Sequence, residues 1–177
     1  MSTFFSMGCV SSQQVQYRIT SQPMTGNDGS PIAAEEREII RALAPFFIAI
    51  TNKDITAMKS MYPAMRNATD EQLVTKFASV KSYTFHGLEN ASFDGEKLKA
   101  KAIYSAEIII PGTIGRNISD YQTEVGLVRE GDFWVINEWK QIKGNGTDME
   151  YFQDIFARIA QAEKRYGVKD LSKWNGL

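Results

Sequence analysis

A long alternation of apolar and polar residues at positions 97–108 limits the possible folds of this chain more than any other segment. One face carries Leu98, Ala100, Ala102, Tyr104, Ala106 and Ile108. The other face includes Lys97, Lys99, Lys101, Ser105 and Glu107. Because successive side chains of a strand point to opposite faces of a sheet, this pattern predicts one long strand with a buried face and a polar face. A similar alternation at residues 80–86 comes before an Asp94-Gly95 turn, which predicts a hairpin.

Two more strands are predicted after this hairpin. Turns are marked by Pro111-Gly112 and Gly131-Asp132. Between them, one face of a strand carries Tyr121, Thr123, Val125 and Leu127. The last strand, residues 133–142, is apolar on both faces, and a strand of that kind is expected to be covered on both sides.

Spacings of three and four residues predict a helix before the strands. Its apolar stripe is Ile39, Leu43, Phe46, Phe47 and Ile50. Ser30-Pro31 is a helix-start signal, so we expect the helix to begin there. Pro45 lies within the stripe and should kink or restart the helix.

Capping signals predict three further helices. Asp54 is the expected cap of a short second helix, and Thr69 forms a capping box with Gln72 at the start of a third. Residues 147–150 form another capping box, and Gly167 is the expected stop of the helix that it opens. This last helix has an apolar stripe, which we expect to pack on the last strand or on a partner subunit.

Together these elements predict a single α+β domain of 177 residues. Its N-terminal helices pack on a curved antiparallel β-sheet, in a cystatin-like or cone-like arrangement, and a C-terminal helix is added. Residues 1–30 are expected to be a low-order segment, residues 31–143 the domain, and residues 144–177 a capping helix and tail.

Composition excludes several classes of function. Lys plus Arg total 20 and Asp plus Glu total 21, and a net charge of -1 argues against a nucleic-acid binder. One cysteine and one histidine exclude an intrachain disulfide and argue against a metal site built on Cys or His ligands, so no cofactor or metal is predicted. No apolar run reaches the roughly 18 residues of a membrane span.

The segment around Cys9 carries two modification signals. Gly8-Cys9 followed by small polar residues resembles the cleavage region of a bacterial lipoprotein, although the stretch before it is short and lacks Lys and Arg. A start at Met7 would instead match the myristoylation pattern. The remaining alternative is an unmodified cysteine in a tail.

The order of helices and alternating strands resembles the nuclear-transport-factor-2-like superfamily, the cone fold of ketosteroid isomerase, scytalone dehydratase and polyketide cyclases. The matching segments are residues 44–54, Met61-Tyr62-Pro63, residues 121–129 and Trp134-Val135-Ile136. The resemblance covers about residues 32–143. It implies a cone closed by sheet and helices, and a homodimer paired through the convex sheet face. It does not imply one activity, because the superfamily contains enzymes, carriers and assembly modules.

The candidate ligand pocket lies on the expected inner wall of this cone. Its residues are Phe47, Tyr62, Tyr83, Tyr104, Tyr121 and Trp134. The catalytic candidates are Glu138, expected in register with Trp134 and Ile136, and Asp54 at the cone mouth. His86, Glu107 and Glu124 fall on the opposite face, where we expect surface or semi-exposed side chains.

An inner wall without a carboxylate favours a non-catalytic module that binds a small apolar ligand or assembles proteins. We expect it to be tethered through Cys9 in the bacterial cell envelope or periplasm, or else to be cytoplasmic. The alternative is an isomerase, dehydratase or cyclase acting on a small apolar molecule, with Glu138, Asp54 and the tyrosines as base and donors. A carrier that binds an apolar ligand without turnover is the third hypothesis.

Overall fold

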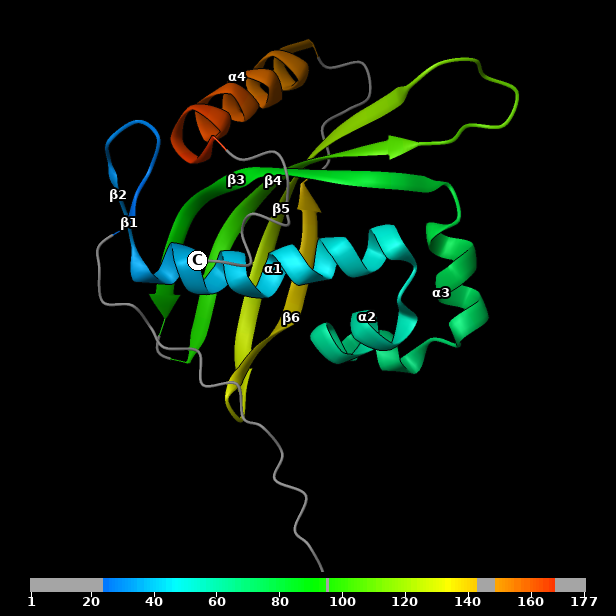
Figure 1. Cartoon of the computed structure of the whole chain (residues 1–177), viewed down its shortest axis with the longest axis horizontal. Coiled ribbons are helices and arrows are strands. Elements are labelled where there is room, and N and C mark those ends of the chain that lie inside the picture. Colours follow the sequence, from blue (N-terminus) through cyan, green and yellow to red (C-terminus); the bar gives the residue numbers. More distant parts are fainter. Residues whose placement is uncertain (1–23, 95, 143–148, 168–177) are drawn as a thin grey trace, which may run out of the picture.

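The computed structural model confirms the predicted order of helices, antiparallel meander and last helix (Figure 1). It describes residues 24–94, 96–142 and 149–167. The helices are α1 (Ala34–Asn52), α2 (Ile55–Met61), the 3-10 helix η1 (Pro63–Asn67), α3 (Asp70–Phe77) and α4 (Met149–Tyr166). The strands are β1 (Met24–Thr25), β2 (Pro31–Ile32), β3 (Val80–Asp94), β4 (Lys97–Ile108), β5 (Asn117–Glu130) and β6 (Phe133–Ile142). The fold class is therefore α+β, with α4 added after the sheet.

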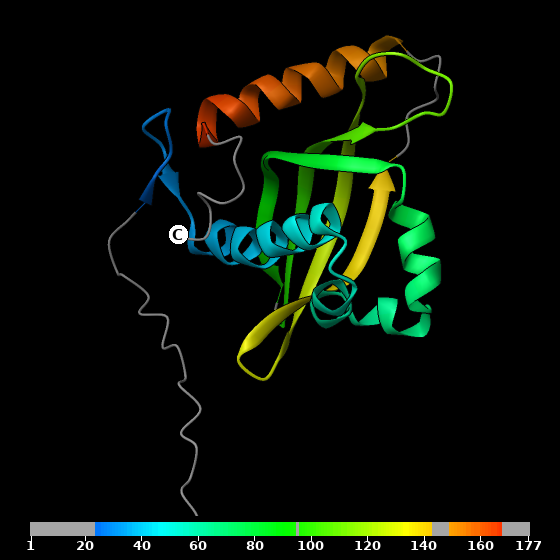
Figure 2. The same cartoon turned by 45° about the vertical axis from the view of Figure 1, so that its right-hand side comes forward.

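Strands β3 to β6 form one sheet in sequence order, each antiparallel to the next. Leu98 pairs with Leu127, and Leu127 pairs with Ile136, so these three side chains share one face, which we call the inner face. Irregular pairing interrupts β3 in three places and the β5–β6 pair in one. Bulges of this kind bend a strand, and Figure 2 shows β3 bending sharply along the sheet.

Helix α1 covers the inner face and forms the core with it. Ile39, Leu43 and Phe47 are fully buried there, and burial of such side chains stabilises the fold by about 1.5–3 kcal/mol each. The helix runs through Pro45 as one element, so the predicted restart does not occur.

Helix α4 lies on the opposite face of the sheet, which we call the outer face (Figure 2). It packs mainly on β3, with further contacts to β4 and β5. The expectation that it would pack on the last strand is therefore wrong. The sheet is covered by α1 on one side and partly by α4 on the other.

The N-terminal boundary also differs from the prediction. Residues 24–32 form a small hairpin of β1 and β2, so the described end of the expected low-order segment has regular structure. Ser30-Pro31 belongs to this hairpin, and α1 starts after Ala33, whose N–H is held by the Glu36 side chain at 2.7 Å. The caps at Asp54 and Thr69 are confirmed. The capping box at 147–150 lies largely outside the described residues.

Candidate functional site

The structure brings four of the six predicted pocket residues together on the inner face. The ring of Phe47 lies 5.0 Å from that of Tyr104 and 5.4 Å from that of Tyr83, centroid to centroid. Tyr104 in turn stacks on Tyr121 at 5.2 Å. At these distances aromatic rings are in contact. The space between α1 and the sheet is therefore filled by rings at this point.

Hydrogen bonding and burial hold two of the phenols of this cluster, those of Tyr104 and Tyr83. The hydroxyl of Tyr104 shares a hydrogen bond of 3.2 Å with that of Thr123, and both side chains are buried. Burial raises the pKa of Tyr83, and the neighbouring phenols of Tyr104 and Tyr121 raise it further. Tyr83 and Tyr104 are thus better explained as core than as an acid or base.

The other two predicted pocket residues lie away from this cluster. Tyr62 contacts Phe46 edge-on at 6.1 Å between centroids. Trp134 contacts Phe93 at 6.4 Å, near the turns that join β3 to β4 and β5 to β6. Both side chains are half-buried. The six residues do not form one pocket wall.

Neither acidic candidate faces the inner wall. A bulge at Asn137 breaks the alternation, so Glu138 pairs with Gly126 on the outer face instead of sharing a face with Ile136. Glu138 is exposed there, which corrects its expected register. Asp54 is also exposed, and its Oδ1 accepts a hydrogen bond of 3.0 Å from the Ala57 N–H, as a helix cap does.

The outer face carries a buried hydrogen-bonded chain that joins four elements. His86 of β3 is 7% exposed, because α4 covers it, so the expected surface position is wrong. Its Nδ1 lies 3.1 Å from Glu163 Oε1 of α4, and its Nε2 lies 2.6 Å from Ser105 Oγ of β4. Ser105 donates a hydrogen bond of 2.5 Å to Asp120 Oδ1 of β5. We call these four residues the outer-face chain.

Ser105, His86 and Glu163 have the order of a hydrolase triad, but not its properties. A nucleophilic serine must give its proton to the histidine and must reach a substrate. Ser105 is 8% exposed and gives its proton to Asp120. The outer-face chain is therefore a structural hydrogen-bonded link between α4 and the sheet.

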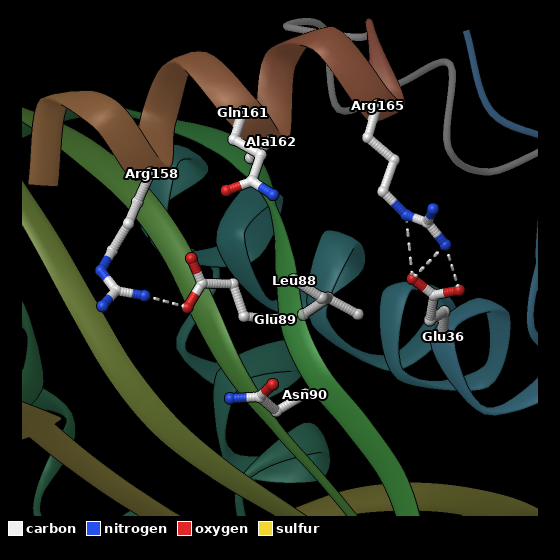
Figure 3. Close-up of a pocket in the computed structure, with 8 residues that line it drawn as sticks. All are labelled: Glu36, Leu88, Glu89, Asn90, Arg158, Gln161, Ala162 and Arg165. Carbon is white, nitrogen blue, oxygen red and sulfur yellow. Dashed lines mark hydrogen bonds and ion pairs between the residues drawn. The ribbon is translucent and has the colours of Figure 1, made fainter. Parts of the chain in front are cut away.

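A hollow of about 420 Å³ opens between α4, β3 and the start of α1 (Figure 3). Its lining consists of Glu36, Leu88, Glu89, Asn90, Arg158, Gln161, Ala162 and Arg165. Figure 3 shows two ion pairs on either side of Leu88. Arg158 Nη1 lies 2.6 Å from Glu89 Oε2, and Arg165 Nη2 lies 2.8 Å from Glu36 Oε2. We call this space the α4 hollow.

Glu36 is the most heavily bonded side chain of the hollow. Burial acts to raise its pKa, but hydrogen bonds from Tyr166, Arg165 and the Ala33 N–H outweigh burial and hold the pKa below its ordinary value. Tyr166 Oη donates to Glu36 Oε1 at 2.6 Å. Glu36 is therefore a fixed anion that joins α1 to the end of α4.

Two amides supply the open hydrogen-bonding capacity of the α4 hollow. Asn90 lies in a bulge of β3 with a left-handed φ of 53°, and Gln161 projects from α4. Both are exposed, and in the described part of the chain neither side-chain amide has a hydrogen-bond partner. Each amide can donate and accept.

Sequence reasoning missed this hollow, although two signals pointed to it. Arg158, Gln161, Ala162 and Arg165 recur at spacings of three and four, which puts them on one face of a helix. Gly87 interrupts a strand, as a residue does where another element approaches closely. The Tyr166 ring lies against it.

The described part of the chain contains neither a cluster of metal ligands nor a membrane-spanning helix. Among residues 24–94, 96–142 and 149–167, no group of three His, Cys, Asp or Glu side chains is arranged to hold a metal. None of the described helices has the length and apolar character needed to cross a membrane. Cys9 lies outside the described residues. Comparison with models of known protein families and with curated proteins found no match to this chain.

Proposed function

We propose that this chain is a non-catalytic binding module whose ligand site is the α4 hollow. The proposal rests on two amides that have no partner among the described residues, those of Asn90 and Gln161, which line a hollow of about 420 Å³. That volume lies in the range of small-molecule sites, and six of the eight residues that line the hollow are polar or charged. The inner wall, by contrast, is occupied by rings in mutual contact.

The ionisable groups of the hollow suit binding better than proton transfer. A general base must take up a proton near the working pH. Glu36 has a lowered pKa and holds Arg165. Glu89 is likewise held by Arg158, and by Gln122 at 3.4 Å. These carboxylates position α4 and the cations beside the ligand.

Charge and hydrogen bonding indicate the ligand class. Each guanidinium of the hollow faces a carboxylate, so a strongly charged ligand gains little net attraction. The amides of Asn90 and Gln161 favour a ligand that both donates and accepts hydrogen bonds. We therefore propose a neutral molecule rich in amide or hydroxyl groups, in place of the small apolar ligand expected from the sequence.

Membership of the nuclear-transport-factor-2-like superfamily, homodimerisation and anchoring through Cys9 remain proposals. The element order and the bent sheet support the first. The proposed dimer surface is partly covered by α4, which leaves the outer side of β6 as the surface for pairing. Light scattering after size exclusion tests the dimer, and the intact mass of the protein from its native cell tests the lipid.

Titration of the full chain with neutral blocked dipeptides and hexoses, followed by calorimetry, tests the binding site. Each lost hydrogen bond should weaken binding about fivefold, so Asn90→Ala combined with Gln161→Ala should weaken it about 25-fold. Gln153→Ala is the matched control, because Gln153 is an exposed residue of the same helix that does not line the hollow. Unchanged affinity in the double variant, or no binding of any probe, would overturn the proposal.

A further inference from the structure

We infer that His86 is a protonation latch, which holds α4 on the sheet when the imidazole is charged and so keeps the α4 hollow in its binding shape. The outer-face chain ends on α4 at Glu163. Its neighbour in sequence, Ala162, lines the hollow, as does Arg165 on the next turn. The inference rests on the proposed function only for the consequence for ligand binding; the latch itself is a property of the fold.

The number of protons shared along the outer-face chain gives the protonation state of the His86 ring. A hydroxyl has one proton, and Ser105 donates it to Asp120, whose ionised carboxylate can only accept. Ser105 Oγ can then only accept from His86 Nε2, 2.6 Å away. The ionised Glu163 can only accept from Nδ1. Both ring nitrogens must donate, and only the imidazolium does so.

The charges around the ring favour this state. Glu163 and Asp120 bracket the imidazole from α4 and β5, with Ser105 of β4 between the ring and Asp120. An opposite charge at short range stabilises the charged form of a titratable group.

A charged pair and a phenol on the described parts of α4 and β3 have partners of their own. Arg158 of α4 and Glu89 of β3 neutralise each other. The Tyr166 hydroxyl donates to Glu36, away from the ring.

Loss of one proton from the ring breaks one bond of the outer-face chain, and the distances indicate which. A proton kept on Nδ1 would leave lone pairs facing each other at 2.6 Å, between Nε2 and Ser105 Oγ, unless the Ser105 hydroxyl turned to Nε2 and gave up its shorter bond of 2.5 Å to Asp120. A proton kept on Nε2 puts the repulsion at the 3.1 Å contact with Glu163. The Glu163 side chain is 30% exposed and can turn into water. The bond to α4 is therefore the one that is lost as pH rises.

Hydrogen exchange of the full, tag-free chain between about pH 6 and about pH 9 tests the latch. His86 is the only histidine, so its ring signals in NMR report its titration without ambiguity. After correction for intrinsic exchange rates, protection of α4 amides should fall about tenfold or more as the ring loses its proton, since a hydrogen bond to a charged group is lost. The two midpoints should coincide.

Two variants separate the latch from general destabilisation. In Glu163→Gln, the amide can accept from a protonated Nδ1 or donate to a neutral one, so α4 protection should lose its dependence on pH. Glu71→Gln, on an exposed site of α3, should keep the wild-type dependence. Constant α4 protection through the His86 titration, or wild-type pH dependence in Glu163→Gln, would overturn the latch. If the latch behaves as stated but no dipeptide or hexose binds at either pH, the proposed function fails alone.

Discussion

Substitution of Gly87 by alanine tests most sharply how α4 sits on the sheet. A Cβ at position 87 would lie 2.3 Å from Cδ2 and 2.5 Å from Cε2 of the Tyr166 ring, and 3.1 Å from Cβ of Ala162. Ordinary contacts between carbon atoms begin at about 3.5 Å, so the ring must withdraw by about 1.2 Å. A phenol ring cannot bend to absorb this shift, so the ring must turn about its side-chain torsions or move together with α4.

The magnitude follows from what the ring holds. Tyr166 Oη donates to the Glu36 carboxylate at 2.6 Å, and a withdrawal of about 1.2 Å stretches that bond beyond hydrogen-bonding range. Loss of a hydrogen bond to a charged group costs about 1.5–3 kcal/mol. Overpacking alone costs about 1–3 kcal/mol. Because moving the ring relieves part of the overpacking, we expect Gly87→Ala to lower the free energy of unfolding by about 2–4 kcal/mol.

A double-mutant cycle separates this clash from backbone strain. Gly87 has a φ of 155°, which disfavours alanine whatever lies beside it. Urea unfolding of wild type, Gly87→Ala, Tyr166→Ala and the double variant gives the cost of Gly87→Ala with and without the ring. The cost should be larger by about 2 kcal/mol when Tyr166 is present. Equal costs in the two backgrounds would refute the described position of α4.

Two further predictions concern charged side chains. The pKa of Glu36 is lowered in the fold, so its stabilising contribution is present above the ordinary carboxylate range and is lost as pH falls through the lowered value. The difference in free energy of unfolding between wild type and Glu36→Gln should therefore be smaller at about pH 3 than at about pH 7, as measured by urea unfolding. Asp54→Ala should cost about 1 kcal/mol in the same assay, through loss of the cap on α2, and leave probe affinity unchanged; lost affinity with a stable fold would return Asp54 to the site.

The elements of this fold were predictable because their signals are local. The alternation at 97–108 fixed both the strand and its buried face, and Leu98 and Ala102 are buried as expected. The caps at Asp54 and Thr69 each depend on a side chain within three residues of its partner. Signals that involve residues so close in sequence can be recognised in a single sequence.

The site was not predictable in the same way, because it depends on bulges and on long-range docking. If the alternation of β6 is extended through Asn137 without a bulge, Glu138 is assigned to the wrong face. One extra residue in a strand moves every later side chain to the opposite face of the sheet. His86 was correctly placed on the outer face, but its burial depends on α4, 77 residues away at Glu163. The periodicity of apolar residues along the sequence gives no information about such a long-range contact.

An amide NMR map of the full chain, recorded during titration with a blocked dipeptide or hexose that binds, locates the ligand on the structure. A ligand in the α4 hollow should give the largest shifts at Leu88, Asn90 and Gln161 and leave the signals of Tyr83 and Tyr104 unchanged. Largest shifts at the two tyrosines would place the ligand on the inner wall and contradict a site under α4.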